Sequence, residues 1–112
     1  MHMIEAVIKP SALGDAKGKL ASLGILGCTA IEVKGFGKQK GHTERYRGGR
    51  MDVGFIPKVL LKVAVKSDDL DKAIEAVVTA ARTGNVGDGK LFVYELTKVE
   101  RIRTGETDND AL

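Results

Sequence analysis

Apolar positions along the chain follow two periods, one typical of strands and one typical of helices. Residues 3–9 and 59–65 are rich in aliphatic and β-branched side chains, which favours strands. From Pro10 to the glycine at 24 the apolar residues recur at helical spacing. A second helix is predicted after residue 66, capped by Ser67 or Asp68 and closed by Gly84. The apolar positions of the two helices are Leu13, Ala16, Leu20 and Leu23, then Leu70, Ala73, Ile74, Val77, Val78 and Ala81.

Further strands are predicted at residues 25–34 and 91–96, with a short exposed one at 99–103. The two halves of the chain echo each other, because Leu13 and Leu70 are 57 residues apart, as are Ala16 and Ala73. Each half reads strand–helix–strand. The sequence therefore predicts an α+β, ferredoxin-like βαββαβ fold, an antiparallel sheet with two helices on one face.

The strand predicted at residues 59–65 is apolar on both sides, apart from Lys62. Such a strand indicates that the second face of the sheet is also covered. A chain this short has no further element for that purpose, which favours a homo-oligomer with sheets packed inward. A monomer with one wetted face remains the alternative.

Composition places the chain among ordinary globular proteins. It has 112 residues, 43% hydrophobic and 29% charged, with a formal net charge of +3, which fits one domain spanning residues 1–112. No apolar stretch approaches the roughly 18–20 residues that a membrane span needs, and the start of the chain lacks the pattern of a secretory signal. Cys28 is the single cysteine, which excludes an internal disulfide. We expect a cytoplasmic protein.

Residues 34–58, here called the long segment, separate two predicted strands and are far longer than a hairpin needs. Six glycines make this segment a poor helix and a poor strand interior, and its charge is mainly basic. A basic, glycine-hinged segment suits a surface that changes shape around an anion or a partner. A merely flexible surface loop is the alternative.

A second glycine-rich element covers residues 83–90. Gly84, Gly87 and Gly89 permit positive φ angles, so that backbone N–H groups can converge on an anion, and Lys90 adds a positive charge. Arg101 and Arg103 would project to one side of an extended run and could clamp phosphate oxygens. The order of elements differs from a Walker A motif, and a plain turn remains the alternative.

The sequence offers no catalytic set. His2 and His42 lie far apart and lack ligands at metal spacing, while the acidic residues near 68–71 suit a helix start. A protein that is not an enzyme is therefore expected.

Several blocks of residues, in the same order, resemble the PII nitrogen-signalling proteins. The blocks are residues 33–43 (VKGFGKQKGHT), 46–48 (YRG), 55–58 (FIPK), 83–92 (TGNVGDGKLF) and 101–106 (RIRTGE). The resemblance implies a homotrimer with nucleotide sites between subunits. It also implies three functional loops: a large T-loop at residues 37–55, a B-loop at 82–90 and a C-loop at 102–109.

The resemblance further implies binding of ATP or ADP and, together with Mg²⁺ and ATP, of 2-oxoglutarate. The nucleotide-binding residues carried over by position are Thr29, Gly35, Gly37, Lys38, Gln39, Gly87, Asp88, Gly89, Lys90, Arg101 and Arg103. Gln39 would also complete the Mg²⁺ shell. The residues implied for 2-oxoglutarate are Gln39, Lys40, Gly41 and Lys58.

By the same resemblance, Arg45, Tyr46 and Arg47 would bind a protein partner. The implied partners are an ammonium transporter, which would recruit the chain to the inner membrane, or an enzyme or kinase of nitrogen metabolism.

At two positions the sequence differs from members of this family that are covalently modified. Met51 stands where many bacterial members carry a uridylylated tyrosine, and Gly49 stands where cyanobacterial members carry a phosphorylated serine. Neither modification is expected.

Three other functions remain open at this point. A divergent relative could keep adenylate binding and sense another anion such as bicarbonate, although Gln39 and Lys58 together favour 2-oxoglutarate. A basic ferredoxin-like nucleic-acid-binding module is less favoured, because aromatic residues make up only 4% of the chain and offer few bases a stacking partner. A slow ATPase would need a general base that the sequence does not display.

Overall fold

The computed structural model describes residues 1–36, 44–45, 51–52 and 54–112. It confirms the predicted βαββαβ order. The six elements are β1 (His2–Ile8), α1 (Leu13–Ser22), β2 (Thr29–Gly35), β5 (Ile56–Val65), α2 (Leu70–Ala81) and β6 (Lys90–Glu95). Two short strands, β3 (Glu44–Arg45) and β4 (Met51–Asp52), lie between β2 and β5.

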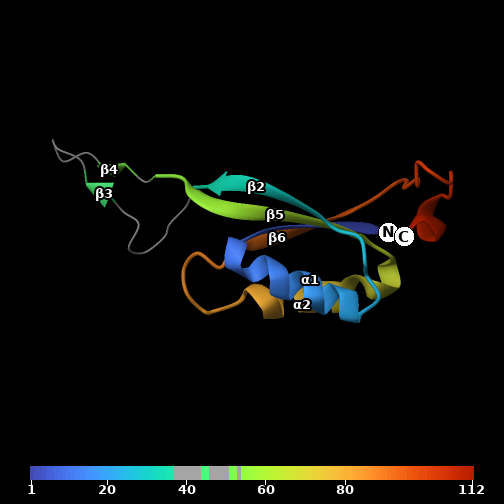
Figure 1. Cartoon of the computed structure of the whole chain (residues 1–112), viewed down its shortest axis with the longest axis horizontal. Coiled ribbons are helices and arrows are strands. Elements are labelled where there is room, and N and C mark those ends of the chain that lie inside the picture. Colours follow the sequence, from blue (N-terminus) through green and yellow to red (C-terminus); the bar gives the residue numbers. More distant parts are fainter. Residues whose placement is uncertain (37–43, 46–50, 53) are drawn as a thin grey trace.

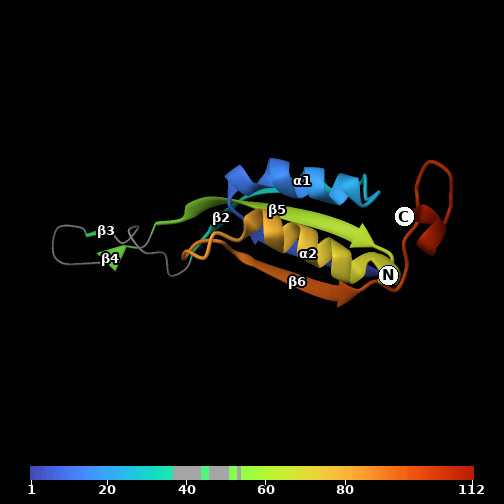
Figure 2. The same ribbon diagram turned by 90° about the horizontal axis from the view of Figure 1, so that it is seen from below.

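The four long strands form one antiparallel sheet in the order β2-β5-β1-β6. Both helices lie on the same face of this sheet, as Figures 1 and 2 show. The register places Ala6 of β1 opposite Leu61 of β5 and Leu91 of β6. The predicted two-layer arrangement is therefore correct.

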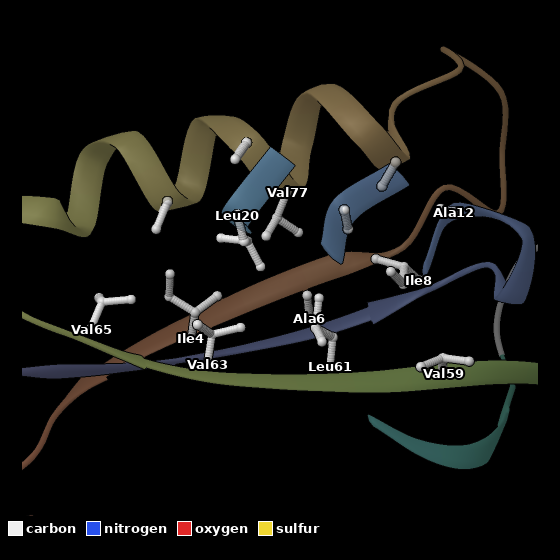
Figure 3. Close-up of a cluster of buried hydrophobic side chains, with 14 residues drawn as sticks. Ile4, Ala6, Ile8, Ala12, Leu20, Val59, Leu61, Val63, Val65 and Val77 are labelled. Carbon is white, nitrogen blue, oxygen red and sulfur yellow. The ribbon is translucent and has the colours of Figure 1, made fainter. Parts of the chain in front are cut away.

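The core lies between the helices and the covered face of the sheet (Figure 3). Along β1 and β5 every second side chain points into it, which is the alternation that a half-covered sheet requires. The fully buried side chains of largest volume are Ile4, Leu20, Leu61, Val63, Val65 and Val77. Most of the predicted apolar positions of both helices contribute to this core, whereas Val78 is half-buried outside it and Leu23 is the clear exception.

The exception is Leu23, which was predicted to belong to the apolar face of the first helix and is 41% exposed. The chain reverses at this point, because Gly24 adopts φ +82°. Its N–H donates to the carbonyl of Ala21 at 2.9 Å, and the N–H of Ile25 donates to that of Leu20 at 3.1 Å. These two bonds form a Schellman motif, which turns Leu23 outward and packs Ile25 against the core instead.

The start and the end of α2 also differ from the prediction. Neither Ser67 nor Asp68 caps the helix with its side chain, because a 3₁₀ turn, Ser67–Asp69, precedes it. The hydroxyl of Ser67 accepts a hydrogen bond from the ammonium group of Met1 at 2.9 Å. The helix ends at Ala81, so Gly84 belongs to the following loop and does not close the helix.

The predicted strand at residues 99–103 is wrong. Only an isolated bridge between Glu100 and Thr107 forms there, and a 3₁₀ turn, Asp108–Ala111, follows. Gly105, at φ +74°, donates its N–H to the carbonyl of Arg101 at 2.7 Å and so closes a turn. Arg101 and Arg103 therefore lie in a turn rather than in an extended run.

The long segment contains a feature that the sequence did not predict. Strands β3 and β4 pair antiparallel, with Glu44 opposite Asp52 and Arg45 opposite Met51. The long segment was predicted to be a poor strand because it contains six glycines. None of these glycines is among the four residues of β3 and β4.

The second face of the sheet carries no helix in the described part of the chain (Figure 1). Large apolar side chains on this face are exposed, among them Ile31 at 43% and Phe92 at 54%. No helix among the described residues has the length and apolar character needed to cross a membrane.

Candidate functional site

The loop at residues 82–90, called here the 82–90 loop, connects α2 to β6. Three of its glycines have positive φ: Gly84 at +88°, Gly87 at +105° and Gly89 at +103°. These conformations are open to glycine and strained for other residues. The sequence prediction of a glycine-shaped loop is thus confirmed, and such a loop can direct backbone N–H groups towards an anion.

Asp88 holds this loop together from inside. One carboxylate oxygen accepts from the backbone N–H groups of Thr83 at 2.6 Å and Gly84 at 2.8 Å. The other accepts from the hydroxyl of Thr83 and pairs with the Nζ of Lys9 at 3.4 Å. The side-chain and backbone hydrogen bonds from Thr83 hold the pKa of Asp88 well below its ordinary value, with smaller contributions from Gly84 and Lys9.

Both carboxylate oxygens of Asp88 are therefore occupied by donors of this chain. The direct contact with a nucleotide that the resemblance implies for Asp88 stays a prediction. Lys9 was not recognised from the sequence as part of this site. Its position at the end of the first strand, directly before Pro10, was the available signal.

Lys58 connects the 82–90 loop to the end of the long segment. Its side chain is buried, at 8% exposure, and its Nζ donates to the carbonyl of Gly87 at 2.5 Å. Burial lowers the pKa of Lys58, the nearby charge of Lys9 lowers it further, and Asp88 opposes the shift. Gly35 makes room for this side chain, because a Cβ at that position would lie 2.9 Å from the Cγ of Lys58.

The residues predicted to bind nucleotide or 2-oxoglutarate fall into two groups within the described part of the chain. Gly35, Lys58 and the 82–90 loop lie at one end of the sheet, where β2 ends. Thr29, where β2 begins, lines a separate cavity of about 750 Å³ together with Arg101. Figure 1 shows the 82–90 loop in orange and the C-terminal turn in red at opposite ends of the sheet.

Arg101 already has partners in its own chain. It pairs with Glu106 at 2.6 Å and donates to the carbonyl of Ala111 at 3.3 Å, while Arg103 is exposed in the same turn. The single chain thus does not bring Arg101 and Arg103 to the 82–90 loop.

Other predicted residues cannot be placed. Gly37, Lys38, Gln39, Lys40, Gly41, Tyr46 and Arg47 lie outside the described residues, and of Arg45 only the backbone, in β3, is described. Within the described residues no cluster of three or more His, Cys, Asp or Glu side chains could hold a metal ion.

Replacing Asp88 by Asn is expected to lower stability at neutral pH, because the side-chain amide adds N–H donors opposite the loop's own donors. The folded pKa of Asp88 lies below its ordinary value of 3.8, so its contribution is present above that value and is lost as the pH falls through the folded pKa. Urea denaturation of wild type and variant should therefore differ at pH 7 and converge on acidification. Glu75→Gln, an exposed change on α2, is the matched control. Equal denaturation midpoints for wild type and Asp88→Asn at pH 7 would contradict this role.

The fold and this loop define the class to which the chain belongs: a small ferredoxin-like α+β protein with a loop whose glycines have positive φ after its second helix. Comparison with known proteins identifies the family. A family model described as Nitrogen regulatory protein P-II matches residues 1–106. The chain is 54% identical to Nitrogen regulatory protein GlnK of Escherichia coli K12, with all of both chains covered. It is 51% identical to Nitrogen regulatory protein P-II of Pasteurella multocida and 50% identical to the P-II protein of Rhizobium etli, again over the full length of each chain.

The chain belongs to the P-II family of nitrogen regulatory proteins. The resemblance inferred from separate sequence blocks is thereby confirmed. The class is that of a regulator acting through protein partners, and the expectation that the chain is not an enzyme is confirmed with it.

Proposed function

We propose that this protein senses ATP or ADP together with 2-oxoglutarate and passes that signal to a protein partner through the large loop at residues 37–55. Nucleotide phosphates would bind Gly87, Gly89 and Lys90 of the 82–90 loop, since the N–H groups of Thr83 and Gly84 donate to Asp88. With Mg²⁺ and ATP present, 2-oxoglutarate would bind beside them, in contact with Gln39, Lys40, Gly41 and Lys58. A bound dianion beside a triphosphate needs cations to offset the repulsion, and Mg²⁺ and Lys58 would supply them.

The hydrogen bond from Lys58 to Gly87 is the observation that supports this proposal most directly. Lys58 ends the long segment, and Gly87 belongs to the proposed phosphate-binding loop. A ligand bound at Lys58 would therefore lie next to Gly87, and a ligand bound at Gly87 would lie next to Lys58. An ammonium group has three donors, so Lys58 can keep this bond and still bind a carboxylate.

The division of the nucleotide-binding residues supports assembly into a trimer. Gly35 and Thr29 lie at opposite ends of the same strand, so one chain cannot bring both to one nucleotide. In a ring with head-to-tail contacts, the end carrying the 82–90 loop would meet the neighbour's end carrying Thr29 and Arg101. The open face of the sheet, with Ile31 and Phe92 exposed, would be covered in the same assembly.

The proposed output is a change in the large loop that favours one docking state over another. A ligand can shift this equilibrium only by its difference in affinity for the two states. Arg45, Tyr46 and Arg47 would contact the partner, such as an ammonium transporter, which would bring the protein from the cytoplasm to the membrane.

We propose that metabolite occupancy is the direct input, since Met51 and Gly49 offer no hydroxyl for covalent modification. Incubation with a P-II uridylyltransferase and UTP should leave the mass of the chain unchanged. A uridylylated residue within 37–55 would contradict this part of the proposal.

Isothermal titration calorimetry tests the coupled binding. We expect ATP and ADP to bind and compete, and 2-oxoglutarate to bind only when Mg²⁺ and ATP are present. Binding of 2-oxoglutarate without Mg²⁺-ATP would contradict the coupling, and absence of nucleotide binding would contradict the proposed function as a whole. A Gln39→Ala variant that responds normally to 2-oxoglutarate would instead favour a relative that senses another anion.

A further inference from the structure

A polar cluster occupies the middle of the open sheet face. Glu5 of β1 and Lys62 of β5 are directly opposite in the register, with the carboxylate 3.8 Å from the Nζ of Lys62. The hydroxyl of Tyr94 on β6 donates to the same carboxylate oxygen at 3.2 Å. Three strands thus contribute one side chain each to a single cluster.

Apolar side chains surround this cluster on the same face. Because side chains alternate along a strand, the positions two residues before and after Glu5 share its face, and so do their cross-strand partners. The apolar neighbours are Met3, Val7, Leu60, Ala64 and Phe92, with Ile31 opposite Leu60, whereas Lys90 opposite Val7 and Thr29 opposite Lys62 are polar. The cluster is therefore an ion pair within a surface that is otherwise mostly apolar.

The ion pair is only partly satisfied within one chain. Lys62 has three N–H donors, and 3.8 Å to Glu5 is longer than a normal hydrogen bond. Its side chain is 35% exposed and that of Glu5 is 26% exposed, so water can complete both while the face stays open. Covering the face would remove that water, and a buried ion pair is tolerated only when further polar partners replace it.

We propose that Glu5, Lys62 and Tyr94 form the recognition element through which one copy of this chain selects another identical copy on the open sheet face. This inference rests on the assembly proposed above. Each copy presents both signs of charge within the same small area. A second copy can therefore supply hydrogen-bond donors and acceptors in place of the water that is removed when the face is covered. A partner of similar apolar shape without this pair would leave both charges buried and incompletely paired.

The physical reason for assigning a second copy, rather than a different protein, is the placement of the two groups of nucleotide-binding residues. The open face carries Lys62, which also lines the cavity beside Thr29 and Arg101. In the ring proposed above, that cavity would meet the neighbour's 82–90 loop, and an unrelated partner would not provide that loop.

Charge reversal tests the proposal without ligand. Sedimentation equilibrium in nucleotide-free buffer is expected to show that Glu5→Lys and Lys62→Glu each weaken assembly by more than about tenfold. The double variant Glu5→Lys/Lys62→Glu should recover most of the loss, because the pair is restored with reversed sign. Lys17→Glu, an identical charge change on the exposed surface of α1, should assemble like wild type.

A mixing experiment separates recognition between chains from a pair that acts only within its own chain. Wild type and the double variant, differently tagged and co-expressed, should form separate assemblies when analysed by native mass spectrometry. Free mixing of these two chains would overturn the inference, as would unchanged assembly of both single variants.

Folding of each variant is checked by circular dichroism. Should a charge reversal fail to fold, Glu5→Gln and Lys62→Met provide the test, with weakened assembly as the expected result and unchanged assembly as the contrary one. A wild-type protein that sediments as a monomer would overturn both this inference and the proposed trimer. A trimeric wild type with trimeric single variants would overturn this inference alone.

Discussion

The Lys58→Met variant is expected to lose binding of 2-oxoglutarate by about a hundredfold or more while it still binds ATP. Methionine retains much of the length and apolar stem of the side chain and removes the charge that would offset a carboxylate. Lys58 is buried, so water screens the lost charge poorly. Isothermal titration calorimetry in Mg²⁺ and ATP measures the effect, with ATP affinity determined separately.

Lys34→Met is the matched control for this variant, because Lys34 is an exposed lysine on β2. It should bind 2-oxoglutarate like wild type. Wild-type affinity in Lys58→Met would show that the effector does not depend on this cation, and the proposed place for 2-oxoglutarate would then be wrong.

Replacement of Gly89 by alanine is expected to lower the free energy of unfolding by about 2–4 kcal/mol. An added Cβ would lie 1.8 Å from the carbonyl oxygen of Val7 and 2.9 Å from its carbonyl carbon, both backbone atoms of β1. The φ of +103° adds strain for any other residue. The loop would have to move away from β1, so nucleotide affinity should fall as well. Urea denaturation and calorimetry measure the two effects.

Two other glycines serve as controls for Gly89→Ala. Gly84→Ala has positive φ but open space around its Cβ, so it isolates the conformational strain and should cost less. Gly18→Ala lies inside α1 with nothing within 4 Å of the new Cβ and should stabilise the helix by about 0.5–1 kcal/mol. If Gly89→Ala proves as stable as Gly84→Ala, the close approach to β1 does not constrain the loop.

The fold was predictable because hydrophobic periodicity reports which side of each element is covered. The apolar, β-branched run at residues 59–65 predicted a strand and the spacing after Leu70 predicted a helix, and the structure confirms both. The end of α1 was harder to predict from the sequence. Leu23 continues the apolar spacing, but the two backbone hydrogen bonds of the following turn decide its direction, and spacing alone does not contain them.

The candidate site was predictable to the extent that glycine reports backbone conformation. Gly84, Gly87 and Gly89 marked the loop correctly. Asp88 stabilises the loop through hydrogen bonds from the nearby Thr83 and Gly84, which the spacing of glycines does not reveal. The participation of Lys9 depends on a contact between residues 79 positions apart, which no local pattern displays. The alternating residues at 99–103 suggested a strand, yet local hydrogen bonds around Gly105 produce a turn.

The separation of Thr29 from Gly35 along β2 has a consequence for cells that make more than one protein of this kind. If each nucleotide cleft has walls from different polypeptides, then exchanging one polypeptide changes the cleft without any mutation. Rings assembled from two different chains would contain clefts formed by residues of both chains, each cleft with its own affinity for the nucleotide. The relative expression of two such genes would then tune the metabolite threshold of the whole population.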